Sequence, residues 1–199
     1  MHASSPQPVT LEGAHVRLEP LTLGHLAALQ EIAFDPGLWR WTGSRIENED
    51  DLRRYVEEAL ELQAKGSALP FATMLRDSGK VVGSTRFANI EPQHRKLEIG
   101  WTWIARPWQR SAVNTEAKYL MLRHAFEALD CIRVELKTDA LNQRSRNAIV
   151  RIGAKQEGIL RRHMVAHGGR VRDTVYFSII REEWPAVKTE LERKMQRET

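Results

Sequence analysis

The residues between a predicted strand and a predicted helix in the middle of the chain could bind phosphate. The apolar run Leu97–Ile104 stops at Pro107, a short basic loop follows, and an amphipathic helix is expected to begin near Asn114 or Thr115. A strand, a tight loop and a helix in this order direct backbone N–H groups and a helix N-terminus at one point, which attracts phosphate. Arg110 adds a guanidinium, which recognises phosphate well. An ordinary connection between a strand and a helix is the alternative.

The strand before this loop predicts a small polar cavity beside a carboxylate. Side chains alternate between the two faces of a strand. One face is therefore expected to carry Leu97, Ile99, Trp101 and Trp103, and the other Glu98, Gly100 and Thr102. The first set is the expected core, whereas the second places a carboxylate beside a missing side chain and a hydroxyl. A solvent-facing or salt-bridged glutamate on a strand edge is the alternative.

A second polar pair stands at the start of a later predicted helix. Asn142 and Ser145 are three positions apart, so on a helix they share a face and can both contact one elongated ligand. Asn is also a common helix cap, and capping alone would explain Asn142.

The segment from Arg106 to Lys118 resembles the acetyl-CoA loop of the GNAT N-acetyltransferases, and is most similar to the ribosomal-protein N-terminal acetyltransferase (RimJ/RimL-like) group. The family pattern Gln/Arg-x-x-Gly-x-Gly/Ala falls on Gln109, Ala112 and Asn114. Ala112 and Asn114 thus stand where the family usually has glycine. Asn tolerates a left-handed backbone, whereas the Ala112 methyl limits the approach of a pyrophosphate. The run Asn-Thr-Glu-Ala-Lys that ends at Lys118 is typical of the RimL-like group.

This resemblance implies roles for particular residues. Glu98, in its Glu-Ile-Gly-Trp setting, would act through water as general base, because an α-amine with a pKa of about 8 must lose a proton before it attacks a thioester. Ser145 would lie near the thioester sulfur and protonate the thiolate, a step that water could take instead. The residues implied in cofactor binding are Thr102, Trp103 and Ile104 along pantetheine, Gln109, Arg110, Ser111, Ala112, Val113 and Asn114 around pyrophosphate, and Asn142 and Asn147 on the later helix.

The elements that must position these residues follow from hydrophobic periodicity and turn residues. Strands are expected at residues 15–18, 71–75, 81–88, 96–104, 132–137, 158–166 and 171–180. Helices are expected at 23–34, 48–64, 115–129, 142–152 and 182–194. Hairpins beside a strand–helix–strand crossover imply a mixed α/β (α+β) sheet with helices on both faces. This order matches the GNAT fold, a mostly antiparallel twisted sheet of about six to seven strands.

Length and composition fit one enzyme domain. The chain has 199 residues, of which 42% are hydrophobic, so residues 9–199 are expected to form a single domain after a loose tail at 1–8. The net charge of +4 favours anionic partners. Cys131 is the single cysteine and is expected to be a buried structural thiol, and the seven histidines show no zinc spacing. Without an apolar run of membrane-spanning length or a signal peptide, a cytoplasmic location is the expectation.

The prediction is an acetyl-CoA-dependent N-acetyltransferase, in which a primary amine of a protein N-terminus or a small molecule attacks the thioester directly. Acetyl-CoA is the expected co-substrate, no metal is expected, and a homodimer stays open. Neither a membrane nor nucleic acid is an expected partner of this enzyme.

Two other functions remain open. A polyamine or antibiotic acetyltransferase could use the carboxylates of Glu47, Glu49, Asp50 and Asp51. A non-catalytic binder of coenzyme A or nucleic acid on the same scaffold would fit the basic surface. Trp39 and Trp41 could line the acceptor site or simply pack a loop.

Overall fold

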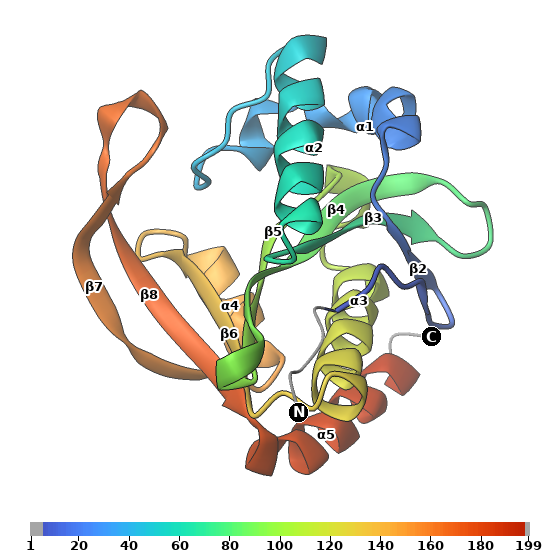
Figure 1. Ribbon diagram of the computed structural model, residues 1–199, viewed down its shortest axis with the longest axis vertical. Helices are drawn as coiled ribbons and strands as arrows, with labels where there is room; N and C mark the ends of the chain where they lie inside the picture. Colours follow the sequence, from blue (N-terminus) through green and yellow to red (C-terminus); the bar gives the residue numbers. More distant parts are fainter. Residues whose placement is uncertain (1–5, 198–199) are drawn as a thin grey trace.

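A single open sheet forms the centre of the molecule, seen in a computed structural model that describes residues 6–197 (Figure 1). Within the described residues, the eight strands follow the order β1-β2-β3-β4-β5-β6-β8-β7. They are β1 (Leu11–Glu12), β2 (Val16–Pro20), β3 (Leu69–Leu75), β4 (Val81–Glu91), β5 (Lys96–Ile104), β6 (Arg133–Asp139), β7 (Lys155–Val165) and β8 (Val171–Ile180). The predicted N-terminal tail falls mostly outside the described residues.

The strand count exceeds the prediction by the two-residue strand β1. Leu11 pairs with Leu18 of β2, but two residues are too few to produce a periodic pattern in the sequence. The mixed and mostly antiparallel character of the sheet is confirmed.

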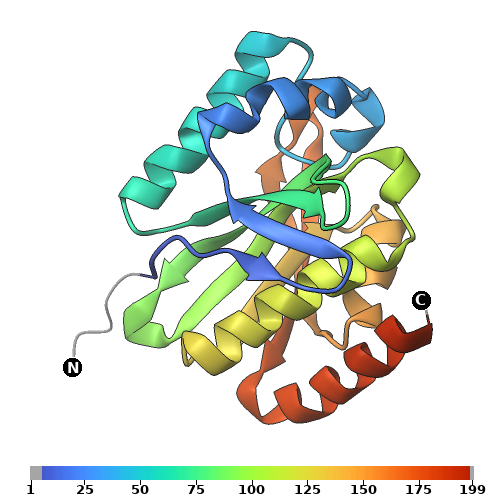
Figure 2. The same ribbon diagram turned by 90° about the vertical axis from the view of Figure 1, so that its right-hand side faces the viewer.

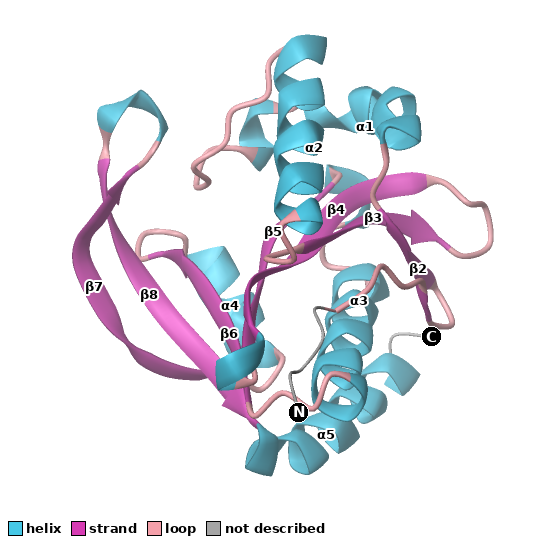
Figure 3. Ribbon diagram, viewed as in Figure 1, coloured by secondary structure: helices cyan, strands magenta, loops and turns pink. Residues whose placement is uncertain are grey.

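Across residues 6–197, five α-helices cover the two faces of this sheet (Figure 3). They are α1 (Leu26–Ala33), α2 (Glu49–Ala64), α3 (Ala112–Arg123), α4 (Gln143–Arg151) and α5 (Trp184–Arg197). Figure 2 shows α1 and α2 on one side of the sheet, and α3 and α5 on the other. One apolar core lies on the α3 side and includes Leu97, Leu120 and Phe177. The other lies under α1 and α2 and includes Leu29 and Val56. The predicted arrangement, with helices on both faces, is therefore confirmed.

The helix ends follow from local chemistry. Asn48 precedes α2, and its side chain accepts a hydrogen bond from the Asp51 N–H at 2.9 Å. Gly66, with φ of 72°, follows the end of α2, and Gly153, with φ of 95°, follows the end of α4. Glycine adopts these left-handed angles without the steric cost that a Cβ brings. These boundaries agree with the sequence analysis.

The two halves of the sheet separate between β5 and β6. These strands are the one parallel pair among the described neighbours, and their pairing covers only Lys96–Glu98 against Arg133–Glu135. Beyond Glu98, β5 continues along β4, while β6 continues along β8 as far as Asp139. One edge of β5 is therefore left without a strand partner over the residues that lead to the phosphate loop. Figure 1 shows the two halves diverging from this point.

A bulge in β5 overturns the predicted alternation of its side chains. The register with β4 runs Ser84 to Trp103 but Arg86 to Gly100, so two residues of β5, Trp101 and Thr102, stand opposite one residue of β4. Trp101 has φ of 48° and is 38% exposed. An extra residue shifts everything beyond it to the opposite face.

The faces of β5 therefore differ from the prediction. Trp103 leaves the face of Leu97 and joins the core under α1 and α2. Thr102 lies on the opposite side of the sheet, because its hydroxyl accepts a hydrogen bond from Lys118 of α3. Glu98 keeps Gly100 as a neighbour but not the hydroxyl of Thr102.

The helix after the loop begins earlier than predicted. It starts at Ala112, and Ser111 caps it by accepting the Val113 N–H at 3.3 Å. The left-handed residue of the loop is Arg110, with φ of 66°, whereas Asn114 lies inside the first turn of α3. Val113, in this first turn, is already buried in the core, so the apolar face of α3 begins before the predicted start.

Candidate active site

The predicted phosphate loop lies at the N-terminus of α3. Ala112, Val113 and Asn114 form the first turn, whose N–H groups have no acceptor within the helix. The helix dipole adds partial positive charge there. The Ser111 hydroxyl also donates to the Trp108 carbonyl at 2.7 Å, which fixes the approach to the helix. This segment can therefore hold an anion through backbone groups.

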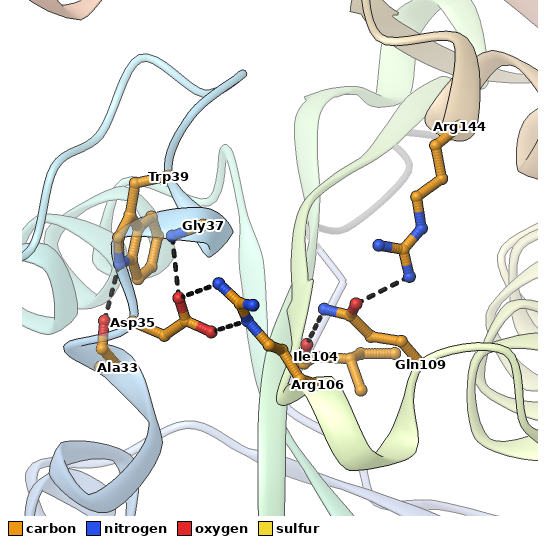
Figure 4. A network of polar contacts seen from close by, with 8 residues as sticks. All are labelled: Ala33, Asp35, Gly37, Trp39, Ile104, Arg106, Gln109 and Arg144. Atoms are coloured by element: carbon orange, nitrogen blue, oxygen red, sulfur yellow. Dashed lines mark hydrogen bonds and ion pairs between the residues drawn. The ribbon is translucent and has the colours of Figure 1, made fainter.

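Gln109 connects this loop with α4 (Figure 4). Its amide nitrogen donates to the Ile104 carbonyl at 2.6 Å, and its oxygen accepts from an Nη of Arg144 at 2.7 Å. Arg144 thereby places a second guanidinium near the loop. The sequence analysis did not assign Arg144 a role, although the arginine-rich run at 144–151 was a signal that could have found it.

An ion pair holds the beginning of the loop against the segment after α1. The guanidinium of Arg106 donates to both oxygens of Asp35, and this contact lowers the pKa of the Asp35 carboxyl (Figure 4). The Gly37 N–H also donates to Asp35 at 2.9 Å. In the same segment, the indole of Trp39 donates to the Ala33 carbonyl at 2.7 Å.

The residues predicted to contact pantetheine lie on β5 beyond the point where β6 departs. Ile104 already uses its carbonyl for Gln109. The side chain of Trp103 is buried and its indole donates to the Tyr55 hydroxyl at 3.3 Å. The hydroxyl of Thr102 accepts from the Lys118 amine at 2.5 Å. The side chains of Thr102 and Trp103 are thus held by hydrogen bonds and that of Ile104 is buried in the core, so a ligand along this edge would meet backbone groups.

The first turn of α4 brings the predicted pair together. The side chain of Asn142 accepts the Ser145 N–H at 3.1 Å, so Asn142 is a helix cap, as the alternative interpretation held. Ser145 is half-buried, whereas Asn147 is exposed and accepts a hydrogen bond from Gln143 at 2.7 Å. Arg146 donates back to the Ala140 carbonyl at 3.3 Å.

Glu98 is buried at the centre of the sheet, with 2% of its surface exposed. Its Oε2 accepts from Asn89 at 2.8 Å and from the Lys137 amine at 2.9 Å. A Cβ added at Gly100 would stand 3.0 Å from Oε1, so glycine at this position leaves room beside that oxygen. Glu98 is therefore ion-paired, as the alternative interpretation held, but it is not a solvent-facing edge residue.

The Asn-Thr-Glu-Ala-Lys run acquires structural roles that the sequence did not reveal. Thr115 accepts from an Nη of Arg151 at 2.6 Å. Glu116 accepts the N–H groups of three successive residues after β1, Ala14, His15 and Val16, each at 2.7 Å. Lys118 lies beneath the bulge of β5. The polar side chains of this run thus attach α3 to its surroundings.

Lys118 is a buried amine without a carboxylate in hydrogen-bond contact among the described residues. It donates to the hydroxyls of Thr85 at 3.1 Å and Thr102 at 2.5 Å. Burial disfavours its charged form and lowers the pKa of Lys118 to about 7. Its position below the bulge makes it a support for this part of β5.

The structure also shows the positions of Cys131, Trp39 and Trp41. Burial raises the pKa of the Cys131 thiol to about 11, which confirms a buried structural cysteine. Trp39 is 5% exposed and packs against Trp103 at 5.2 Å, so it fills the core, while Trp41 lies under Arg170 at 5.5 Å. Over residues 6–197, no group of side chains could hold a metal ion and no helix could cross a membrane.

The acidic residues considered for polyamine binding lie at the exposed start of α2. Glu49 accepts from Gln30 at 2.5 Å, and Asp51 pairs with Arg54 at 3.5 Å. The guanidinium of Arg45 contacts Glu47. Three of these carboxylates are thus engaged by nearby side chains.

The structure thus brings together a sheet that separates between β5 and β6, the N-terminus of α3 and the buried carboxylate of Glu98. Residues 15–155 match the model described as "Acetyltransferase (GNAT) domain", and the chain therefore belongs to the GNAT acetyltransferases.

Individual relatives agree with this assignment. The protein named "Putative ribosomal N-acetyltransferase YdaF" of Bacillus subtilis (strain 168) is 33% identical over 110 residues, which are 55% of this chain and 59% of that relative. The chain thus aligns with less than two thirds of that relative. A GCN5-related N-acetyltransferase from Brucella melitensis has 30% identity and a TM-score of 0.87, covering 96% of this chain and 87% of that chain.

A third comparison concerns the fold. Mycobacterium smegmatis RimJ, solved in complex with CoA-disulfide, has a TM-score of 0.82 at 24% identity, with 94% of this chain and 95% of that chain covered. At this identity the likeness supports the fold alone. Together these findings confirm the GNAT family.

Proposed function

We propose that the protein is an acetyl-CoA-dependent N-acetyltransferase whose acceptor is a primary amine, either of a protein N-terminus or of a small molecule. One observation carries the proposal: β5 and β6 part directly after Glu98, between a buried carboxylate and two helix N-termini. The name of the Bacillus relative supports a ribosomal protein as one acceptor.

The donor would lie along the free edge of β5. Backbone groups of Thr102 and Trp103 would pair with pantetheine as an added strand does. The first turn of α3, with Arg110 and Arg144 nearby, would hold the pyrophosphate. Ala112 is the first helical residue, so glycine is not needed there for a left-handed backbone, and pyrophosphate would have to approach the turn beside the Ala112 methyl.

The reaction is a direct transfer. The amine nitrogen attacks the thioester carbonyl, the C–N bond forms and the C–S bond breaks. The amine proton passes through water to Glu98, whose Oε1 lies beside Gly100. A backbone N–H near Trp103 would stabilise the oxyanion, and Ser145 or water would protonate the departing thiolate. Catalysis then rests mainly on positioning and electrostatics.

The two other candidate functions have less support. A polyamine needs several carboxylates near the reacting amine, but the acidic group at the start of α2 is exposed and bonded to neighbouring side chains. A non-catalytic binder would have no use for a buried carboxylate held by Asn89 and Lys137 beside Gly100.

An assay of thiol release from acetyl-CoA, with N-terminal peptides, polyamines, amino acids and aminoglycosides as acceptors, tests the proposal. The Glu98→Gln variant should lower kcat by roughly 100-fold or more, because it removes the proton acceptor, and should leave acetyl-CoA binding unchanged. Glu135→Gln is the matched control, since Glu135 pairs with Glu98 in the strand register but bonds to Arg133 at 2.8 Å. Equal turnover in wild type and Glu98→Gln would remove Glu98 from its role.

A further inference from the structure

Arg86 is a buried cation without a counterion. It lies on β4, is 3% exposed, and its Nε is buried without a hydrogen-bond partner. Among the residues that the structure describes, no carboxylate lies within ion-pair distance of its guanidinium. An unpaired charge in a protein interior is costly, so it commonly marks a place where a ligand supplies the opposite charge.

Two aromatic rings fix the position of this guanidinium. It stacks on the ring of Tyr55 of α2 at 5.0 Å and on the ring of Trp101 at 5.1 Å. Trp101 is the bulged residue of β5, and a bulky side chain at φ of 48° occupies a strained conformation that clusters at functional sites. The Tyr55 hydroxyl also lies 3.4 Å from the Trp101 carbonyl. The strained bulge and the unpaired cation thus form one unit.

The surrounding face has more positive than negative charge. Lys137 pairs with Glu98, and Arg170 pairs with Asp139. Arg172, 7% exposed, lies close enough to interact electrostatically with Asp139, Arg170 and Glu98. The two carboxylates are therefore matched by Lys137 and Arg170, and the two remaining arginines are in surplus. Such a face attracts an anion and repels a polycation.

We propose that the acceptor carries a carboxylate close to its reactive amine, and that Arg86, stacked between Tyr55 and Trp101, binds this carboxylate. The proposal rests on the function proposed above and narrows its substrate class to amino acids or peptides with an acidic residue at the N-terminus. A polyamine is the substrate that it argues against.

The strand register places Glu98 and Arg86 close together, which favours an acceptor whose amine and carboxylate are a short distance apart. Arg86 stands opposite Gly100, and Glu98 is the next residue of β5 on the same face. Such diagonal neighbours have Cα atoms roughly 7–8 Å apart. A Cβ at Gly100 would stand 3.0 Å from Glu98 Oε1, and Arg86 is the residue of β4 directly opposite this glycine. One short molecule can therefore direct its amine toward Glu98 and its carboxylate toward Arg86.

Pairs of acceptors that differ only in the carboxylate test the proposal, and they distinguish a free amino acid from a peptide with an acidic N-terminal residue. Thiol release would be measured with free α-amino acids against their primary amides, and with Asp-Ala peptides against Asn-Ala peptides, both amidated at the C-terminus. Wild-type kcat/KM should be at least tenfold higher for the acid member of one series. A preference among free amino acids identifies a small acid, and a preference among peptides identifies an acidic N-terminus.

Variants connect this preference with Arg86. Arg86→Met should raise KM for the acid at least tenfold and leave its amide unaffected, so that the preference disappears, while coenzyme A binding stays unchanged. Arg86→Gln serves where the Met variant fails to fold, and Arg86→Lys should restore part of the preference. Arg53→Met, on the exposed side of α2, is the matched control and should behave as wild type.

A binding measurement distinguishes failure of this proposal from failure of the proposed function. N-acetylated amino acids and their amides would be titrated into protein saturated with coenzyme A. Binding heat that is seen with the N-acetylated acids but not with their amides, and that is lost in Arg86→Met, supports the anion site even where no acceptor is turned over. Turnover of amines without preference for the acid, or equal loss for acid and amide in Arg86→Met, overturns the anion site and leaves the transferase intact. The absence of both turnover preference and acid binding also overturns it.

Discussion

Lys118 lies in an environment that disfavours the charged form of its side chain. An amine that is 6% exposed, with only the hydroxyls of Thr85 and Thr102 as hydrogen-bond partners, is better accommodated neutral than charged. It lies directly beneath the bulge that carries Trp101. The bulge beside the proposed reaction site is therefore supported by a lysine that destabilises the fold when it is protonated.

This arrangement predicts a specific pH dependence of stability. Burial lowers the pKa of Lys118 from 10.5 to about 7, so between these values the unfolded chain binds one more proton than the folded protein. The free energy of unfolding should therefore rise with pH in this window, by at most about 1.4 kcal/mol per pH unit, and this contribution should be flat below it.

Denaturant unfolding of wild type and Lys118→Met across this pH range measures the effect. The free energy of unfolding of wild type should increase relative to that of Lys118→Met as the pH rises from about 7.5 to 9.5. Lys65→Met, at an exposed lysine, should show no such trend relative to wild type. A difference that stays constant with pH would mean that Lys118 is charged in the folded protein.

At the scale of elements, α3 is attached to the sheet by its own first two turns. The Glu116 carboxylate accepts three backbone N–H groups after β1, and a Cβ at Gly13 would stand 2.4 Å from its Cδ, so Gly13 makes room for the contact. Charge-assisted hydrogen bonds of this kind are stronger than neutral ones. They set the position of the N-terminus of α3, where the phosphate loop ends.

Glu116→Gln should therefore destabilise the protein. The amide keeps the shape but turns an N–H₂ group toward backbone donors, and an unmatched buried donor costs about 2 kcal/mol. Glu12→Gln, at a carboxylate that is 52% exposed and 3.2 Å from Arg17, should change stability by less than about 0.5 kcal/mol. Equal midpoints of thermal unfolding in the two variants would contradict the anchoring role of Glu116.

The order and type of most elements could be predicted from the sequence because periodicity, caps and turn glycines are local signals. Asn48, Asn142 and Gly153 mark helix ends where the structure has them. The bulge at Trp101 could not be predicted, since it depends on pairing with β4 and leaves no mark in the alternation of apolar residues. Consequently Glu98 and Gly100 were correctly placed together, and Thr102 was placed on the wrong face.

The site shows the same division between local and long-range information. The loop residues from Gln109 to Asn114 were found from a motif, because they are contiguous in the chain. Arg86 and Arg144 were missed, since their importance arises from the rings of Tyr55 and Trp101 and from the side chain of Gln109, all distant in sequence.

At the scale of the whole molecule, the parting of β5 and β6 is the feature on which the account depends. It creates a free strand edge that leads from the buried Glu98 to the first turn of α3, with α4 opposite. A long ligand with a thioester at one end and phosphate groups at the other would match this arrangement, in which a free strand edge leads to a helix N-terminus.

Calorimetric titration of the wild-type protein with coenzyme A and with pantetheine measures this match most directly. Coenzyme A should bind with a dissociation constant on the order of micromolar, and pantetheine at least tenfold more weakly, because the phosphate contacts should contribute about 1.4 kcal/mol or more. The absence of heat with coenzyme A, or equal affinity for the two compounds, would contradict a phosphate site at the start of α3.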